Sequence, residues 1–209
     1  MLRLYWASID PAPFSEGDLP LSEYRKEKLQ TVRSPQLRQE MLGAEWLLNR
    51  AVTEWDTQAT LPLSIGTREE GKPFLRELPL EFSLSHSGPY VVCAVADHEI
   101  GVDIQRRSTA KDSLLRRCFS EGERAYIEAS FDPAAAFTEL WSLKESYVKA
   151  LGVGLSLSFS SFSIELSEPR RLVGDPAVSF WTFVGEDYAL SVCALDGNDP
   201  KPDMVIRGM

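Results

Sequence analysis

An aspartate lies in a segment where a carboxylate is costly unless it has a partner. Asp103 stands between Val102 and Ile104, so on an extended strand it points away from the face of its apolar neighbours. A carboxylate in so apolar a segment is expensive unless it is paired or bound to a metal ion. Asp103 is therefore either a surface residue near a strand end or part of a site.

A second group of candidate residues recurs every four positions on a predicted helix. Trp141, Glu145 and Lys149 share one helix face, because residues four apart are neighbours on a helix. An ordinary exposed Glu–Lys pair at this spacing would contribute only about 0.2–0.5 kcal/mol. The flanking Trp141 and Val148 indicate instead a half-buried face, where a carboxylate and an ammonium favour a site.

Hydroxyl and imidazole groups gather where another predicted strand ends. Ser85, His86 and Ser87 follow one another there, and such groups can hold phosphate oxygens. His86 is one of only two histidines, although a lone histidine is also compatible with a structural role. Lys72 lies in a predicted turn, Glu-Gly-Lys-Pro at 70–73, which is either a plain exposed turn or part of the same site.

The elements that must position these groups mix strands and helices. Strands are predicted at 1–10, 60–66, 74–76, 81–86, 90–97, 100–104, 159–166, 178–184 and 188–195. Helices are predicted at 22–33, 36–55, 114–119, 121–129 and 134–151. Residues 196–209 are rich in Pro, Gly and charge and are expected to be loose.

A short internal similarity indicates two halves of like design. The segment PYVVCAVADHE at 89–99 is similar to DYALSVCALDG at 187–197, and each is an apolar strand that follows a long helix. Two unrelated buried strands can also match this well by chance. We predict two α/β halves, 1–105 and 106–209.

Composition narrows the class of protein. The chain has 209 residues, of which 44% are hydrophobic and 25% charged, as in soluble globular proteins. A net charge of −9 disfavours a nucleic-acid partner, and no apolar stretch approaches the length of a membrane span. Cys93, Cys118 and Cys193 form no CxxC pair, and the N-terminus has no apolar signal region. We expect a reduced, cytoplasmic protein without a membrane partner.

Together the motifs resemble those of the 4'-phosphopantetheinyl transferase superfamily, specifically its Sfp-like type. That family shows a (V/I)G(V/I)D(I/V) strand, an F(S/A)xxE segment and a WxxKE(S/A)xxK helix. This chain has, in family order, GKP at 71–73, LSHS at 84–87, GVDI at 101–104, FSEGE at 119–123 and WSLKESYVK at 141–149. The resemblance covers roughly residues 22–195. It implies an α+β fold of two similar α/β halves related by pseudo-twofold symmetry, with the active site at their interface.

The resemblance also implies a reaction. Coenzyme A would give its 4'-phosphopantetheine group to a serine of an apo acyl or peptidyl carrier protein, with release of 3',5'-ADP. Asp103 and Glu145 match acidic residues that hold Mg²⁺, an ion that favours oxygen ligands. Gln105 stands where Sfp-like members often have a third acid, so either its amide or a water takes that place. Lys149 matches a lysine near the pyrophosphate, and Glu145 could also help to deprotonate the serine.

Contacts with coenzyme A follow from the same resemblance. Ser85 and His86 match phosphate-contacting residues, and Lys72 matches a lysine at the nucleotide. Arg25 and Lys28 align approximately with a basic pair that holds the 3'-phosphate, although a solvated charged helix would have the same composition. Fatty acid, polyketide and nonribosomal peptide carriers all remain possible, and a monomer is expected because both halves build the site.

Two other classes of protein remain open at this point. One is a different Mg²⁺-dependent phosphate enzyme, which the absence of GxxxxGK(S/T) and GxGxxG motifs disfavours. The other is a binding module that takes up coenzyme A without transferring any part of it.

Overall fold

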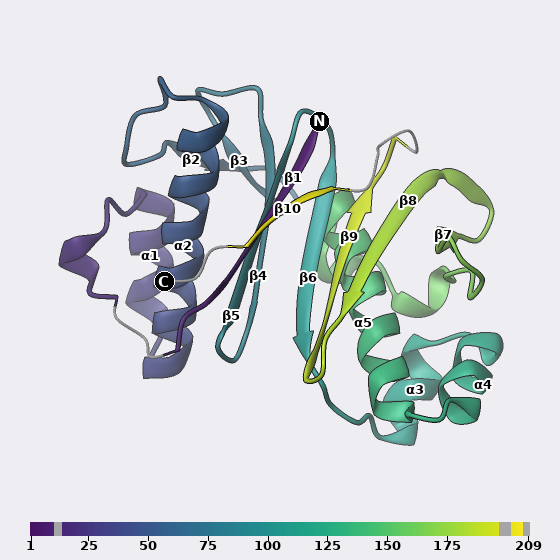
Figure 1. The fold of residues 1–209 in the computed structure, drawn as a ribbon. Helices are drawn as coiled ribbons and strands as arrows, with labels where there is room; N and C mark the ends of the chain where they lie inside the picture. The colour runs from purple at the N-terminus through teal and green to yellow at the C-terminus, as the bar shows by residue number, and fades with distance from the viewer. Residues whose placement is uncertain (11–13, 197–201, 207–209) are drawn as a thin grey trace.

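Two four-stranded sheets face one another at the centre of the molecule (Figure 1). This computed structural model describes residues 1–10, 14–196 and 202–206. The first sheet has the order β10-β1-β5-β4, with β1 (Leu2–Ser8), β4 (Glu81–Ser87), β5 (Tyr90–Ala96) and β10 (Asp203–Ile206). The second sheet has the order β6-β9-β8-β7, with β6 (Ile100–Arg106), β7 (Arg171–Leu172), β8 (Asp175–Val184) and β9 (Tyr188–Ala194).

Helices cover the outer face of each sheet (Figure 1). On the first sheet lies α2 (Pro35–Trp55), with α1 (Glu23–Thr31) packed against α2, and β2 (Ile65–Thr67) and β3 (Pro73–Leu75) form a small hairpin nearby. On the second sheet lies α5 (Pro133–Leu151), with α3 (Asp112–Cys118) and α4 (Glu121–Ala129) beside it. Three short 3-10 helices, η1 (Glu16–Asp18), η2 (Gly154–Ser156) and η3 (Phe159–Ser161), complete the described elements.

Local signals in the sequence explain where the two long helices begin and end. The Ser34 side chain accepts a hydrogen bond at the start of α2, and Asp132 does the same for α5. Both helices have proline in the first turn, where a missing N–H costs nothing. Gly152 ends α5 with φ of 75°, a left-handed conformation that glycine adopts without strain.

The core follows from alternation along the strands. Val92 on β5 and Val102 on β6 point into the layer between the sheets. Cys93, one residue further along β5, points instead toward Leu47 of α2. Successive side chains on a strand face opposite ways, so each inner strand supplies two hydrophobic layers. The result is a stack of helix, sheet, sheet and helix.

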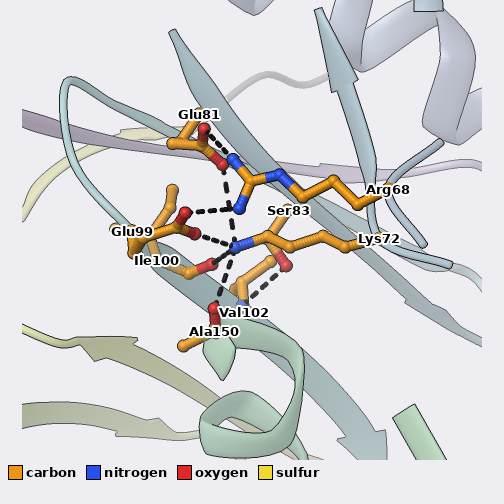
Figure 2. Close-up of polar contacts among 8 residues, drawn as sticks. All are labelled: Arg68, Lys72, Glu81, Ser83, Glu99, Ile100, Val102 and Ala150. Atoms are coloured by element: carbon orange, nitrogen blue, oxygen red, sulfur yellow. Dashed lines mark hydrogen bonds and ion pairs between the residues drawn. The ribbon is translucent and has the colours of Figure 1, made fainter. Parts of the chain in front are cut away.

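Serines join the edge strand of one sheet to the edge strand of the other. Ser83 Oγ on β4 accepts a hydrogen bond from the backbone N–H of Val102 on β6 at 3.0 Å (Figure 2). Ser87 Oγ accepts one from the backbone N–H of Arg106, also at 3.0 Å. Ser85 lies between them at the same period of two, so its hydroxyl also faces β6. The two sheets therefore meet along β4 and β6 through side chains.

The predicted α+β class is confirmed, and most predicted elements lie within a few residues of the observed ones. The predicted strand at 159–166 is wrong: this segment holds η3 and a single bridge at Ile164. The predicted loose tail is wrong at 203–206, because β10 pairs in parallel with β1; residues 197–201 and 207–209 lie outside the described residues.

Two features bear on the predicted halves. Strand β6 lies in the second sheet and β10 in the first, so the chain crosses between the sheets twice. The division at residue 105 and the twofold relation between the halves stay predictions. Within the described part of the chain, no helix combines the length and the apolar character needed to cross a membrane.

Candidate active site

Strand β6 presents Asp103 to helix α5. Val102 and Ile104 belong to the core between the sheets, and Asp103 points the opposite way, as the alternation predicts. Its Oδ1 atom accepts hydrogen bonds from Lys149 Nζ and from Ser85 Oγ, both at 2.7 Å. Asp103 is only 5% exposed, so the alternative of a surface aspartate is wrong.

The second carboxylate oxygen of Asp103 is unsatisfied. Its Oδ2 atom is buried and has no hydrogen-bond partner within the described residues. Glu145 lies close enough to feel this charge: burial raises the pKa of Glu145, the negative charge of Asp103 raises it further, and Lys149 opposes both effects. Two carboxylates held together in this way repel one another and favour a cation between them.

Metal binding by these groups can be tested against the donors present. No group of three or more His, Cys, Asp or Glu side chains suited to a metal ion occurs in the described part of the chain. Asp103 and Glu145 offer oxygen atoms, and Mg²⁺ is commonly held by one or two carboxylates plus water and substrate phosphates. The unpartnered Oδ2 atom and the adjacent Glu145 therefore fit Mg²⁺ in this mode.

Lys149 connects the two sheets. Its Nζ atom donates to Asp103 on β6 and, at 2.9 Å, to Ser85 Oγ on β4. The ion pair of Lys149 is with Asp103, so the alternative of a Glu145–Lys149 pair along the helix is wrong. Because Lys149 and Glu145 both line the cavity described below, the ammonium group can bind an anionic group that enters beside Glu145.

Close packing of α5 on β6 sets these positions. A Cβ atom on Gly101 would lie 2.0 Å from the Ser146 carbonyl oxygen and 2.4 Å from the Ala150 nitrogen. Only glycine leaves room for the helix backbone at this distance. The glycine of the GVDI motif therefore brings the helix residues Glu145 and Lys149 up to Asp103.

His86 is oriented by a carboxylate on α2. Its Nδ1 atom lies 2.8 Å from Glu40 Oε2, and Gln36 Nε2 donates to Glu40 Oε1 at 3.0 Å. Burial lowers the pKa of His86, Glu40 opposes this, and the positive charges of Lys149 and Arg25 add to it. The contact with Glu40 leaves Nε2 as the imidazole nitrogen available to a ligand.

The two basic residues predicted on α1 differ in burial and in their partners. Arg25 is buried, and its Nε atom donates to Glu45 Oε2 at 3.1 Å. Glu45 also accepts the backbone N–H of Ser22 at 2.8 Å, which fixes it in place. Lys28 is exposed and its Nζ atom lies 5.1 Å from the ring centroid of Tyr24. The alternative of a fully solvated helix is therefore wrong for Arg25.

One cavity brings most of the predicted residues together. It has a volume of about 810 Å³, within the range of small-molecule sites. The site residues predicted from the sequence that line this cavity are Arg25, Lys28, Lys72, His86, Glu145 and Lys149. Helices α1 and α2, beside the first sheet, and helix α5, on the second, all contribute to its walls. Ser85 and Asp103 are not among the lining residues and meet the cavity wall through Lys149.

Two predicted residues are placed differently. Lys72 lines the cavity, yet its Nζ atom donates to Glu99 and to two backbone carbonyls. Gln105 is half-buried on the same strand face as Asp103 and does not line the cavity. Its amide makes no hydrogen bond within the described residues. The other predicted residues thus line the cavity or contact Lys149, whereas Gln105 does neither.

Several residues at the cavity were not predicted from the sequence. Glu40 and Glu45 orient His86 and Arg25, but acidic residues on a charged amphipathic helix carry no signal of such a role. Arg117 and Phe159 line the cavity from segments predicted as the end of a helix and as a strand. The spacing of aromatic residues does not show which of them faces a cavity.

Three comparisons describe what this chain is similar to. A sequence model of the "4'-phosphopantetheinyl transferase superfamily" matches residues 99–193. A 4'-phosphopantetheinyl transferase from Bacillus subtilis is 30% identical over 207 residues, which cover 92% of this chain and 92% of that protein. The 4'-phosphopantetheinyl transferase psf-1 from Bacillus pumilus is 37% identical over 136 residues, which cover 63% of this chain and 57% of that protein. A crystal structure of a holo-(acyl-carrier-protein) synthase from Bacillus anthracis in complex with CoA (3',5'-ADP) has a TM-score of 0.43 and 20% identity, and the match covers 48% of this chain and 96% of that one.

Proposed function

Because this chain belongs to the 4'-phosphopantetheinyl transferase superfamily, we propose that it transfers the 4'-phosphopantetheine group of coenzyme A to a serine of an apo acyl or peptidyl carrier protein. The enzyme is a 4'-phosphopantetheinyl transferase, in line with relatives that match most of its length. The second product of the reaction is 3',5'-ADP.

The phosphates of coenzyme A are held by cations and donors along the cavity. Arg25, Lys28 and His86 line one part of it and receive the 3'-phosphate. Lys149 lies beside Ser85 and receives the pyrophosphate. This local group of cations offsets the net charge of −9, which would otherwise repel a polyanion.

The chemical step is a direct displacement. The serine oxygen of the carrier forms a bond to the β-phosphorus as the bond from that phosphorus to 3',5'-ADP breaks. The serine proton passes to Glu145, directly or through a water. Lys149 stabilises the negative charge that develops on the leaving phosphate.

Magnesium belongs to this proposal. Asp103 and Glu145 would hold Mg²⁺, with Gln105 or a water at a third position. When bound, Mg²⁺ would neutralise charge on the pyrophosphate.

The observation that carries the proposal is the meeting of Asp103, Glu145 and Lys149, the last two of which line the cavity. The test incubates the protein with coenzyme A, Mg²⁺ and a panel of apo carrier proteins. Carrier mass and released 3',5'-ADP are measured. We expect the carrier to gain one phosphopantetheinyl group and 3',5'-ADP to appear in equal amount. A carrier whose acceptor serine is replaced by alanine is the control. Uptake of coenzyme A with no release of 3',5'-ADP from any carrier would instead identify a binding module.

The setting of the enzyme is part of the proposal. Cys93, Cys118 and Cys193 are all free and buried, as is usual in a reducing compartment, which supports a cytoplasmic location. The cavity is completed within one chain, which supports a monomer. Neither a nucleic acid nor a membrane is needed as a partner.

A further inference from the structure

Lys72, in the turn between β2 and β3, places its ammonium group where helix α5 meets strand β6. Lys72 Nζ donates to Glu99 Oε2 at 2.5 Å, to the Ala150 carbonyl at 2.9 Å and to the Ile100 carbonyl at 3.3 Å (Figure 2). A lysine ammonium has three N–H donors, and these three acceptors match them in number. Lys72 is 8% exposed. Little capacity is left to bind a phosphate oxygen.

The acceptors lie where helix α5 and strand β6 meet. Ala150 is in the last turn of α5, where backbone carbonyls lack partners within the helix and positive charge is favourable. Ile100 begins β6, and the next residue, Gly101, touches the backbone of α5 directly. Lys72 therefore contacts the end of the helix and the start of the strand on which that helix packs.

The stem of Lys72 adds a packing contact to these polar ones. Gly152 ends α5, and a Cβ atom there would lie 2.9 Å from Cδ of Lys72. The lysine chain thus runs directly under the residue that terminates the helix. Both the stem and the ammonium hold the same turn.

A second cation balances the charges around Lys72. Arg68 donates to Glu81 at 2.6 Å and to Glu99 at 2.5 Å (Figure 2). Burial acts to raise the pKa of Glu99, but the hydrogen bonds from Lys72 and Arg68 prevail and lower it. Two cations and two anions make a neutral network. Removing one member leaves a partly buried charge without its partner.

We propose that Lys72 is a positioning residue that fastens the C-terminal turn of α5 to the β2–β3 turn, and that it does not contact a phosphate of coenzyme A. Lys149 immediately precedes Ala150 on α5, so the fastening keeps Lys149 beside Asp103. The reaction that Lys72 supports rests on the proposed function, whereas the fastening itself can be measured without catalysis.

The test compares Lys72→Met with Lys28→Met, a second lysine that lines the cavity. Amide hydrogen exchange is measured for residues 146–152, and Kd is measured for 3',5'-ADP and for 5'-AMP. For Lys72→Met we expect exchange about tenfold faster or more in this turn. The ratio of the two Kd values should change less than about twofold, since no contact with the 3'-phosphate is lost.

Lys28→Met should behave in the opposite way. Exchange in α5 should stay within about twofold of the wild type. The preference for 3',5'-ADP over 5'-AMP should fall by about fivefold or more, because a contact with the 3'-phosphate is lost. A Lys72→Met protein that loses this preference while α5 exchanges at the wild-type rate would overturn the proposal.

Steady-state kinetics separate positioning from binding. For Lys72→Met we expect kcat to fall by about tenfold, with KM for coenzyme A within about twofold, because the loss lies in the placement of Lys149. A rise in KM with unchanged kcat would contradict this. If the wild type shows no transfer at all, the proposed function fails, and the exchange experiment still decides the role of Lys72.

Glu99→Gln tests the positioning role of Lys72 without altering Lys72 itself. This variant replaces Lys72→Met in the test if Lys72→Met does not fold. A positioning role predicts faster exchange at the end of α5 and no gain in affinity for 3',5'-ADP, because the network is weakened. A phosphate-binding role predicts the reverse: Lys72 is released, 3',5'-ADP binds more tightly and α5 exchange is unchanged.

Discussion

His86 shows how a neighbouring residue decides what a site residue can do. Its Nδ1 atom is held by Glu40, and the groups that act on its charge are Glu40, Lys149 and Arg25. Burial has the largest effect and lowers the pKa of His86. Glu40 is the one group in this set that favours the protonated form. It therefore keeps the imidazole closer to the state that can donate to a phosphate.

Glu40→Gln should lower the pKa of His86 further, since it removes the negative charge that opposes the effect of burial. The pKa of His86 in the folded protein lies below the ordinary histidine value of about 6.5, so the unfolded chain binds more protons as pH falls below that value. Stability is lost in that acidic window, and Glu40→Gln should widen the window toward lower pH. NMR titration measures the pKa directly, because the chain has only two histidines.

The control for this prediction is Glu27→Gln, an exposed glutamate on α1. It should leave the titration of His86 unchanged. An unchanged pKa in Glu40→Gln would show that the contact with Glu40 does not govern the charge of the imidazole.

Gln105 poses a separate question at the residue scale. It shares a strand face with Asp103, but its amide is not at the cavity. Gln105→Glu should preserve or raise the transfer rate, by up to about tenfold, because a carboxylate is a better Mg²⁺ ligand than an amide. The initial rate at limiting Mg²⁺ measures this. A folded Gln105→Glu protein without activity would show that the position tolerates no added charge.

At the scale of elements, the contact of α5 with β6 organises the site. The helix supplies Glu145 and Lys149, the strand supplies Asp103, and Gly101 lets the two backbones approach. Lys144, on the same helix, is fully buried and pairs with Glu123 at 3.1 Å. It also donates to carbonyls in the 159–162 segment, so α5 anchors a wall of the cavity as well.

Gly101→Ala should displace α5, because the added methyl group would collide with helix backbone atoms. We expect a loss of about 1–3 kcal/mol in the free energy of unfolding, or more. Turnover should fall as well, because Lys149 moves relative to Asp103. Urea denaturation followed by circular dichroism measures the first effect.

Gly122→Ala is the matched control for this substitution. Gly122 lies in α4, and no atom lies within 4 Å of a Cβ added there. Alanine favours a helix over glycine by up to about 1 kcal/mol, so this variant should be as stable as the wild type or more stable. If Gly101→Ala behaves like Gly122→Ala, the close approach of α5 does not limit the fold.

The elements could be predicted where local patterns decide them. Helical spacing located α5, and alternation placed Asp103 opposite its apolar neighbours. The 159–166 segment does not form the predicted strand: Lys144 and Glu123, which are distant in sequence, bind its backbone carbonyls at Phe159 and Phe162 and its backbone N–H at Ile164. The pairing of β10 with β1 joins residues 203–206 to residues 3–6, and a local sequence pattern cannot predict a contact between segments so far apart.

The same limit applies to the site. Motif spacing identified Asp103, Glu145 and Lys149, because strand and helix periods fix which side chains share a face. It did not show that the ammonium group of Lys72 binds Ala150 and Glu99, since those contacts depend on how distant segments of the chain pack together.

At the scale of the whole molecule, the cavity exists because two sheets meet along β4 and β6. Their contact runs through the serine hydroxyls of β4. Within the described residues, links of three kinds cross it: the hydrogen bonds of these serines to β6, the hydrogen bond from Lys149 on α5 to Ser85 on β4, and the network around Lys72. The site is thus held by the junction of the two sheets, and its cations lie on both sides of it.

The most direct test of the account is calorimetric titration of Mg²⁺ into the protein with coenzyme A bound. The wild type should bind one Mg²⁺, and Asp103→Asn and Glu145→Gln should each lose that binding while circular dichroism shows an intact fold. Asp112→Asn, on the exposed side of α3, should bind as the wild type does. Wild-type Mg²⁺ affinity in Asp103→Asn or in Glu145→Gln would show that these two carboxylates do not form the metal site, and would contradict the account.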